Sequence, residues 1–340
     1  MNIATYILRR GIFAIFVLLS VMTITFVLSH SLGGDPIYSW LGKAAGLHPQ
    51  LAAAYAAKYH LNDPVYVQYY YYLVNLSQGN LGYSPSRNFV PVAQVISQTL
   101  PYTLQIAFFA IMMTLIVGIL LGVTSARYNH TSIDNGIRAA YMAGYGSPPF
   151  FVGLVLLIIF TYHFGLLPSG GAFDPNLTPP TWITGIPMID SLLEGNFQYF
   201  GSAIIHVILP SLALAICFFG IVTRVLRSSM LEVMHANYIR TARAKGLDEG
   251  TIFYKHGLRH ALIPIVSLSS LIVTWIITGT IFVENIFSYP GMGRYVVQAL
   301  NGQDYPGILG TTIVYAIVIV ASNLAADILY AVVDPQVRLG

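Results

Sequence analysis

Charged side chains are scarce in this sequence. Asp, Glu, Lys and Arg make up 9% of the 340 residues, whereas 56% of the residues are hydrophobic. Water-soluble globular domains carry roughly 25% charged residues. A fold of this size with so little charge lacks the polar surface that keeps it dispersed in water. The composition therefore excludes a water-soluble globular domain and predicts an integral membrane protein.

Cysteine is nearly absent, since Cys217 is the only one. A single cysteine excludes a disulfide within the chain and a metal site built from several thiolates. Cys217 lies in the middle of an apolar stretch, so we interpret it as a small packing residue.

The motifs of nucleotide binding and hydrolysis are also missing. Gly42-Lys43 is followed by Ala44 and lacks the upstream glycine of a phosphate-binding loop, and Gly291-Met-Gly-Arg294 follows no predicted strand. Neither the zinc-peptidase nor the serine-hydrolase motif occurs. We therefore expect the chain not to be an enzyme and to bind no cofactor of its own.

Six long stretches contain no Asp, Glu, Lys or Arg. Each exceeds the roughly 20 residues that a helix needs to cross about 30 Å of hydrocarbon. The stretches are Gly11 to Gly34, Asn88 to Ala126, Ala139 to Phe173, Gly195 to Thr223, His260 to Val283, and Tyr305 to Ala326. They predict six transmembrane helices, the second beginning at Pro101 and the third ending at Pro168-Ser-Gly-Gly171.

The basic residues are unevenly divided between the two sides of such a bundle. With the N-terminus inside, the inner segments hold twelve of the sixteen: Arg9, Arg10, Arg127, Arg138, Arg224, Arg227, Arg240, Arg243, Lys245, Lys255, Arg259 and Arg338. The outer segments hold Lys43, Lys58, Arg87 and Arg294. Because Lys and Arg favour cytoplasmic loops, both termini are predicted to be cytoplasmic. The apolar stretch after Arg10 is long for a signal peptide, which favours an uncleaved first helix over residues 1–32.

The outer segment, residues 33–100, combines turn signals with two predicted helices. The turn signals are Gly33-Gly-Asp-Pro36 and Asn80-Leu-Gly82, and the helices cover Gln50 to His60 and Val65 to Leu76. The run Tyr69-Tyr-Tyr-Tyr72 could stack on a substrate, but packing at the membrane interface is the favoured interpretation.

The inner segment from Arg224 to Arg259 holds seven of the sixteen basic residues. Its Met230, Met234, Tyr238 and Ala242 recur at helical spacing, which predicts one continuous helical face. Gly246 suits the left-handed position after a helix, and Leu247 can pack back over the last turn. Asp248 can then cap a second short helix through Ile252 and Tyr254.

Two interpretations compete for this inner segment. A basic loop can simply fix the topology of the protein. However, topology does not require a capped helix, whereas the small residues Ala236, Ala242 and Ala244 offer a surface on which a partner can dock. We favour docking.

Ionisable residues inside spans are few. They are His163 and His206, with Glu284 and Asp327 near span ends. A carrier driven by protons or sodium is expected to bury carboxylates near the middle of the membrane. None is clearly placed there, so the chain moves solute passively or takes its energy from a partner. A stand-alone carrier and a membrane-embedded enzyme are the weaker alternatives.

The segment Tyr238-Ile-Arg-Thr-Ala-Arg-Ala-Lys-Gly246 strongly resembles the cytoplasmic loop of binding-protein-dependent ABC importer permeases of the dipeptide/oligopeptide class. His256 to Pro264 continues the resemblance, with Gly257 where this family usually has Ala. Further similar motifs are Tyr6 to Arg10, Gly33 to Pro36 (Gly33 replacing a Pro), Leu61 to Pro64, Gln68-Tyr69, Gly79 to Gly82, Glu284 to Arg294, Asp304 to Pro306 and Asp334 to Arg338.

This resemblance implies an all-α type I importer permease fold. Residues 33–100 would be extracytoplasmic, residues 101–334 would form a five-helix core with the coupling loop 224–260, and residues 335–340 would be a cytoplasmic tail. The family works as a heterodimer with a second permease, together with two cytoplasmic ATPase subunits that bind ATP and Mg and an external solute-binding protein. The residues expected to dock on an ATPase subunit are Tyr238, Arg240, Thr241, Ala242, Arg243, Ala244, Lys245 and Gly246.

The resemblance leaves the substrate open. Di- and oligopeptides are the favoured cargo, with oligosaccharides or nickel as alternatives in related permeases. The expected location is the plasma or inner membrane, in contact with lipid and without nucleic acid. The residues that line the translocation path are not identified by the sequence.

Overall fold

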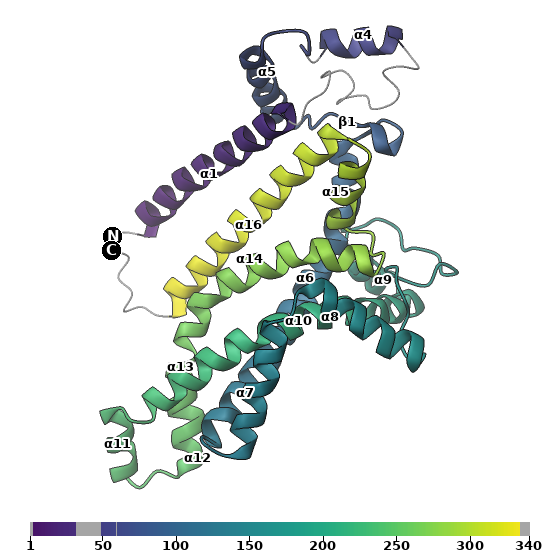
Figure 1. Ribbon diagram of the computed structural model, residues 1–340. Coiled ribbons are helices and arrows are strands. Elements are labelled where there is room, and N and C mark those ends of the chain that lie inside the picture. Colours follow the sequence, from purple (N-terminus) through teal and green to yellow (C-terminus); the bar gives the residue numbers. More distant parts are fainter. Residues whose placement is uncertain (1–2, 32–48, 59, 334–340) are drawn as a thin grey trace.

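The computed structural model describes residues 3–31, 49–58 and 60–333, which are mostly helical (Figure 1). In chain order the elements are α1 (Ile3–Ser31), α4 (Pro49–Lys58), α5 (Val65–Ser77), β1 (Tyr83–Ser84), η1 (Pro85–Arg87), β2 (Val90–Pro91), α6 (Val92–Arg127), α7 (Ser132–Tyr145), α8 (Pro149–Leu156), the π-helix η2 (Leu157–His163), α9 (Pro187–Leu193), α10 (Phe197–Val233), α11 (Asn237–Ala244), α12 (Glu249–Thr251), the π-helix η3 (Ile252–Gly257), α13 (Leu258–Ala261), α14 (Ile263–Ile286), α15 (Met292–Asn301) and α16 (Tyr305–Val333). The predicted turn at Gly33 to Pro36 and the motif at Asp334 to Arg338 lie outside these residues.

All six charge-free stretches fall on helices. Within the described residues, α1, α6, α10, α14 and α16 are each long and apolar enough to cross a membrane. The third stretch is instead a broken pair, in which α7 and α8–η2 meet at 107°. The break lies at Gly146-Ser-Pro148, because proline lacks a backbone N–H and disfavours helical geometry in the residue before it. Among the described residues there are thus five helices long and apolar enough to span a membrane and one bent pair, which gives six spans if the pair crosses the membrane as one.

Two predicted span boundaries are wrong. The second span, α6, begins at Val92, and Pro101 lies inside the helix. Val92 and Val95 are buried, so packing of the extra turns outweighs the hydrogen bond that Pro101 cannot donate. The third span ends at His163, before the predicted stop at Pro168 to Gly171. In the outer segment, α4 and α5 match the two predicted helices closely.

The core of the bundle is the contact between α6 and α10. Gly118 and Gly122 let the two backbones approach closely: an added Cβ would lie 2.6 Å from the Cβ of Val222 at the first and 3.0 Å from the Cβ of Leu226 at the second. The hydroxyl of Thr223 also donates to the carbonyl of Gly118 across the interface at 3.3 Å. Two small residues four apart, with a hydroxyl bond between helices, are typical of helix packing in membranes.

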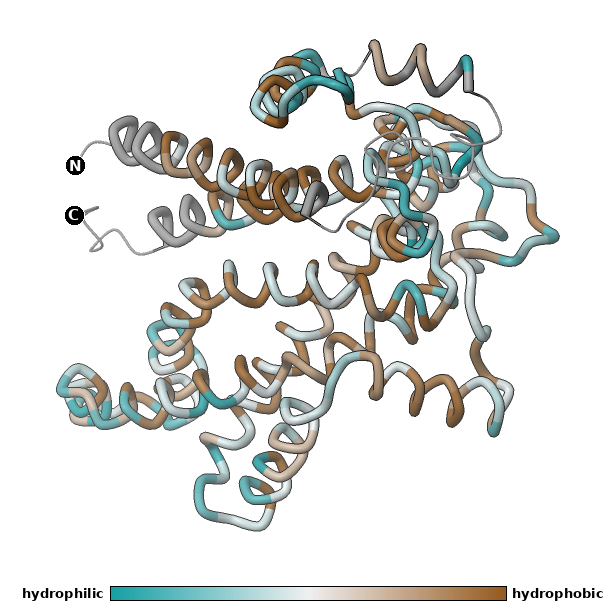
Figure 2. The backbone as a smooth tube through the Cα atoms, turned by 45° about the horizontal axis from the view of Figure 1, so that its top comes forward, coloured by the Kyte–Doolittle hydropathy of each residue, from teal (hydrophilic) through white to brown (hydrophobic). Residues whose placement is uncertain are grey.

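The bundle has two distinct ends. Figure 2 shows hydrophobic residues along the long helices and hydrophilic residues gathered in the connecting segments. In Figure 1, α11 and α12 lie at the lower left, and α15, β1 and α9 lie at the opposite end. The first turns of α1 and the last turns of α16 lie on the side where α10 ends and α14 begins. The described ends of α1 and α16 thus lie on the side of the loop 224–260, and the cytoplasmic location of the termini stays a prediction.

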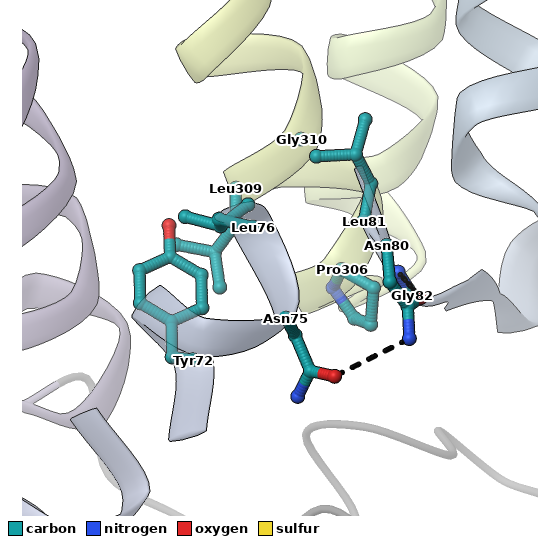
Figure 3. A pocket seen from close by; sticks show the side chains of 9 residues that line it. All are labelled: Tyr72, Asn75, Leu76, Asn80, Leu81, Gly82, Pro306, Leu309 and Gly310. Carbon is teal, nitrogen blue, oxygen red and sulfur yellow. Dashed lines mark hydrogen bonds between the residues drawn. The ribbon is translucent and has the colours of Figure 1, made fainter. Parts of the chain in front are cut away.

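The outer segment is joined to the core through α5 and α16 (Figure 3). Tyr72 is buried with Leu309, and its ring lies 5.3 Å from that of Phe26 on α1. The side chain of Asn80 donates to Asn75 at 3.4 Å, and a cavity of about 20 Å³ remains at the joint. This volume holds about one water molecule, so the joint is a structural contact and not a ligand pocket.

The tyrosine run divides between packing and exposure. Tyr69 hydrogen-bonds the hydroxyl of Thr23 on α1 at 2.6 Å, and Tyr72 is buried. The ring of Tyr71 stacks on His60 with 3.6 Å between centroids. Tyr70 is 62% exposed. Tyr69 and Tyr72 therefore pack within the protein, and their position at the membrane interface stays a prediction.

Candidate functional site

The helix α11 stands out from the bundle as a short, mostly exposed element. It begins after Ala236, whose backbone is extended at φ −66° and ψ 150°. Ile239 is fully buried, and α11 contacts the π-helix η3. The ring of Tyr238 lies 5.0 Å from that of His260. Since Arg240, Thr241, Ala244, Lys245 and Gly246 are exposed, the outward face of α11 is available to a partner.

The end of α11 is fixed by its own backbone. Gly246 has φ +78°, the left-handed conformation that glycine adopts without a steric penalty. The N–H of Gly246 donates to the carbonyl of Arg243 at 2.9 Å, and the N–H of Leu247 donates to that of Ala242 at 3.4 Å. These two bonds form a Schellman motif, which satisfies carbonyls that the helix end leaves free. The predicted stop at Gly246 is confirmed.

A second cap follows directly. The side chain of Asp248 accepts the N–H of Thr251 at 2.8 Å and so starts α12, as predicted. Arg243 forms an ion pair with Glu249 at 2.7 Å, which the sequence did not predict. The hydrogen bond from Arg243 lowers the pKa of the Glu249 carboxyl below its ordinary value. Of the eight predicted docking residues, Arg243 is thus already paired within its own chain.

The predicted continuous face from Met230 to Ala242 is wrong. The helix α10 ends at Val233, where the N–H groups of His235 and Ala236 bond carbonyls only three residues back. Met230 is fully buried in the bundle, Ala242 is half-buried and Ala244 is exposed. The turn between α10 and α11 places Ile239 in a buried position, and this burial stabilises the break between the two helices. The small-residue face is therefore divided, with Ala244 outside and Ala242 partly covered.

A buried ion pair ties the inner ends of three helices together. Asp134 of α7 is fully buried and accepts Nε and Nη2 of Arg227 of α10 at 2.8 and 2.7 Å. Ser125 of α6 donates to the same carboxylate at 2.5 Å. Such a bidentate pair holds its partners in a fixed orientation. Movement of α10 at this end must therefore carry α6 and α7 with it.

A second buried carboxylate lies at the opposite end of the bundle. Glu284 of α14 is fully buried and accepts the hydroxyl of Thr103 at 2.7 Å and the N–H of Arg294 at 3.0 Å. The hydroxyl of Thr103 in turn accepts the N–H of Met292 at 2.8 Å. A Cβ at Gly291 would lie 2.4 Å from the carboxyl carbon, so glycine is required for this approach. The carboxylate thus caps the N-terminus of α15.

A third carboxylate fixes the start of α16. Asp304 accepts the N–H of Gly307 at 2.8 Å and the hydroxyl of Ser86 at 2.6 Å, and Ser84 also donates to it. The short hairpin β1–β2, paired antiparallel with Tyr83 opposite Pro91, is thereby fastened to α16. The motifs around Glu284 and Asp304 serve to cap helices and join segments.

Comparison with known proteins places the chain in a family. The family model described as "Binding-protein-dependent transport system inner membrane component" matches residues 118–339. The model described as "Binding-prot-dependent transport system membrane comp, N-term" matches residues 3–107. The chain belongs to this family of transport permeases. The predicted resemblance and the membrane location are confirmed.

Curated relatives of this permease match along nearly their whole length. The probable D,D-dipeptide transport system permease protein DdpB of Escherichia coli K12 is 37% identical over 96% of the chain and 95% of that protein. The oligopeptide transport system permease protein AppB of Bacillus subtilis 168 is 36% identical over 98% of the chain and 99% of that protein. A solved chain of the MetNI methionine ABC transporter, in inward facing conformations, covers 72% of this chain and 96% of its own at 17% identity, but its TM-score of 0.49 is too low to support an inference.

Among the residues whose side chains are described, the other ionisable residues that the sequence singled out do not form a common site. His206 lies 2.8 Å from the carbonyl of Ser202 on the preceding turn, and His163 is exposed. Glu284 is engaged as a helix cap. The side chain of Asp327 lies outside the described residues. Sequence reasoning named Glu284 but assigned no role to it, and it missed Asp134 because a buried pair between distant residues leaves no local pattern.

Proposed function

We propose that this permease forms one half of the translocation path of an ATP-driven importer for di- and oligopeptides. Separate ATPase subunits bind ATP and Mg and dock on α11, a second permease completes the path, and an external solute-binding protein delivers the peptide. The observation that carries the proposal is the exposed, doubly capped helix α11 in a chain of this family.

Several features of α11 and of its neighbour α10 support a role of α11 in transmitting force. Its outward face is exposed, while Ile239 is fully buried on the inward face. The caps at Gly246 and Asp248 make the loop rigid, so that it does not bend when a docked partner moves it. The neighbouring α10 has 37 residues and is therefore about 55 Å long. Displacement of α11 can thus be passed to the bundle as rigid-body movement.

The cargo is proposed from the relatives. Both relatives described above carry peptide transport in their names, D,D-dipeptide for one and oligopeptide for the other. At 36 to 37% identity over nearly full length, a shared class of cargo is the simplest assignment. Oligosaccharides and nickel are the alternatives that the test must separate.

Uptake into proteoliposomes tests this proposal. The purified complex of permeases and ATPase subunits is reconstituted with ATP inside, and a labelled dipeptide is added outside with the binding protein. The expected result is uptake that requires ATP and every subunit. Uptake by the permease alone along an ion gradient would show a secondary carrier. ATP-driven uptake of an oligosaccharide or nickel instead would retain the importer and reject the peptide.

A further inference from the structure

A cavity of about 540 Å³ opens at the end of the molecule opposite α11. It lies where α15, the first turns of α6, the short helix η1 and the loop before α9 meet. Tyr102 and Trp182 line it with aromatic rings, and the ring of Tyr295, which also lines it, is fully buried. Small-molecule sites are typically clefts of about 300–1,000 Å³ with aromatic walls and a few polar groups.

Two arginines line this cavity from positions far apart in the chain. Arg87 comes from η1 and Arg294 from α15. They are two of only four basic residues that the predicted topology places on the outer side. The ion pairs formed among the described residues do not include either of them. Their meeting at one cavity brings two guanidinium groups together on a side of the protein where basic residues are rare.

Neutral contacts hold both guanidinium groups in place. Nη2 of Arg87 donates to the side-chain oxygen of Gln298 at 2.6 Å, and its Cζ lies 5.8 Å from the centre of the Tyr295 ring. Nη1 of Arg294 donates to the carbonyl of Ser288 at 2.7 Å. A guanidinium has five N–H donors, so each arginine keeps donors for a ligand. The contacts orient the charges without neutralising them.

The end of α15 does not supply this positive charge. Its N-terminal N–H groups at Met292 and Arg294 are already bonded to Thr103 and to the buried carboxylate of Glu284. The arginine side chains, not the helix end, are therefore the groups that face a ligand. Guanidinium groups bind planar carboxylates through paired N–H bonds, and a cleft of one sign attracts the opposite charge.

We propose that this cavity binds the C-terminal carboxylate of an incoming peptide through Arg87 and Arg294. The proposal rests on the proposed function, since it takes the cargo to be a peptide. The free carboxylate is common to all unmodified peptides, so a site for it accepts cargo of any sequence. The aromatic wall then contacts the side chain beside the carboxylate. An acidic side chain of the binding protein or a lipid headgroup would not need a concave aromatic site of this volume.

Direct binding to the permease–ATPase complex, without the binding protein, tests the site. The complex is placed in phosphatidylcholine nanodiscs. The change in tryptophan fluorescence reports binding of alanyl-phenylalanine or its C-terminal amide, and a Trp182→Phe variant, which loses this change, shows that the signal comes from Trp182. Arg87→Gln and Arg294→Gln should each weaken binding of the free acid about tenfold or more, the scale of a lost charged hydrogen bond. The amide should bind the wild type as weakly as the acid binds the variants. Arg138→Gln, an exposed arginine on α7, should change nothing.

The other outcomes are distinct. Equal binding of acid and amide to the wild type would overturn the proposal. So would arginine variants that bind peptide normally but lose affinity for the loaded binding protein, which would identify a protein contact. A signal produced only by added phosphatidylglycerol would identify a headgroup site. Unchanged melting temperatures of the variants would show that the fold is intact. If the wild-type complex imports no peptide in the proteoliposome assay, the proposed function fails separately.

Discussion

Replacement of Gly246 by valine isolates the backbone geometry at the end of α11. Gly246 has φ +78°, and an added Cβ would meet no atom within 4 Å. The substitution therefore creates no clash, and its whole effect is the strain of a β-branched residue in the left-handed conformation. Asn tolerates this conformation better than other non-glycine residues, so Gly246→Asn is the matched variant.

The size of the effect follows from that strain. A left-handed L-residue costs roughly 1–2 kcal/mol, which lowers the ratio of capped to uncapped loop by a factor of about 5–30. A partner that binds only the capped loop loses apparent affinity in proportion to the fall in the capped fraction, at most by this factor. We therefore expect Gly246→Val to reduce peptide uptake and binding-protein-stimulated ATP hydrolysis several-fold, with Gly246→Asn between Val and wild type.

The assay compares uptake and ATP hydrolysis in proteoliposomes at several ATPase concentrations. Gly136→Val is the control, because Gly136 lies in a helix without positive φ and a Cβ there also meets nothing within 4 Å. Melting temperatures should match for all variants, since the spans are untouched. Wild-type uptake by Gly246→Val would refute the reasoning, as would equal losses for the Val and Asn variants.

Three further substitutions probe the other parts of the structure. Ala244→Trp should weaken ATPase binding in a pull-down without lowering the melting temperature, whereas Ala242→Trp should lower both, because only Ala242 is half-buried. Asp134→Asn should destabilise the detergent-solubilised protein by about 3–5 kcal/mol, because this is the usual loss when one partner of a buried ion pair is removed. Thermal unfolding measures the loss, and an unchanged melting temperature would show that the pair with Arg227 is not structural. Gly291→Ala should lower the melting temperature, because its Cβ would lie 2.4 Å from the buried carboxyl carbon of the cap, and a stable variant would contradict that geometry.

The sequence predicted the elements whose causes are local. Apolar helices follow from the cost of charge in hydrocarbon, so the gaps between charged residues located the five long helices and the bent pair found among the described residues. The stop at Gly246 and the cap at Asp248 depend on single residues with strong preferences. Pro148 also has a strong local preference, so the bend there could have been predicted from the sequence. It was missed because the apolar stretch around it is long enough for one uninterrupted span.

The errors arose where distant contacts decide the structure. Pro101 is tolerated inside α6 because Val92 and Val95 gain burial. The helix α10 stops at Val233 because the turn buries Ile239, and no residue in between is a strong helix breaker. The docking role of α11 stays a prediction that the structure makes testable.

The same contrast holds for the two arginines of the outer cavity. Arg87 and Arg294 are separated by most of the chain, and only folding brings them to one wall. Their one sequence signal is that basic residues are rare in the outer segments. That signal marks them as unusual without indicating that they meet.

The most direct test of the account is to cross-link α11 to the ATPase subunit. Thr241→Cys and Ala244→Cys place thiols on the exposed face of α11, and Tyr70→Cys places one on α5 at the opposite end; native Cys217 is buried. With a short thiol cross-linker and a cysteine in the ATPase cleft, both α11 variants should form a permease–ATPase product whose yield changes with ATP, and the Tyr70 variant should not. A product absent from both α11 positions in a complex that still transports peptide would contradict the assignment of α11 as the docking helix.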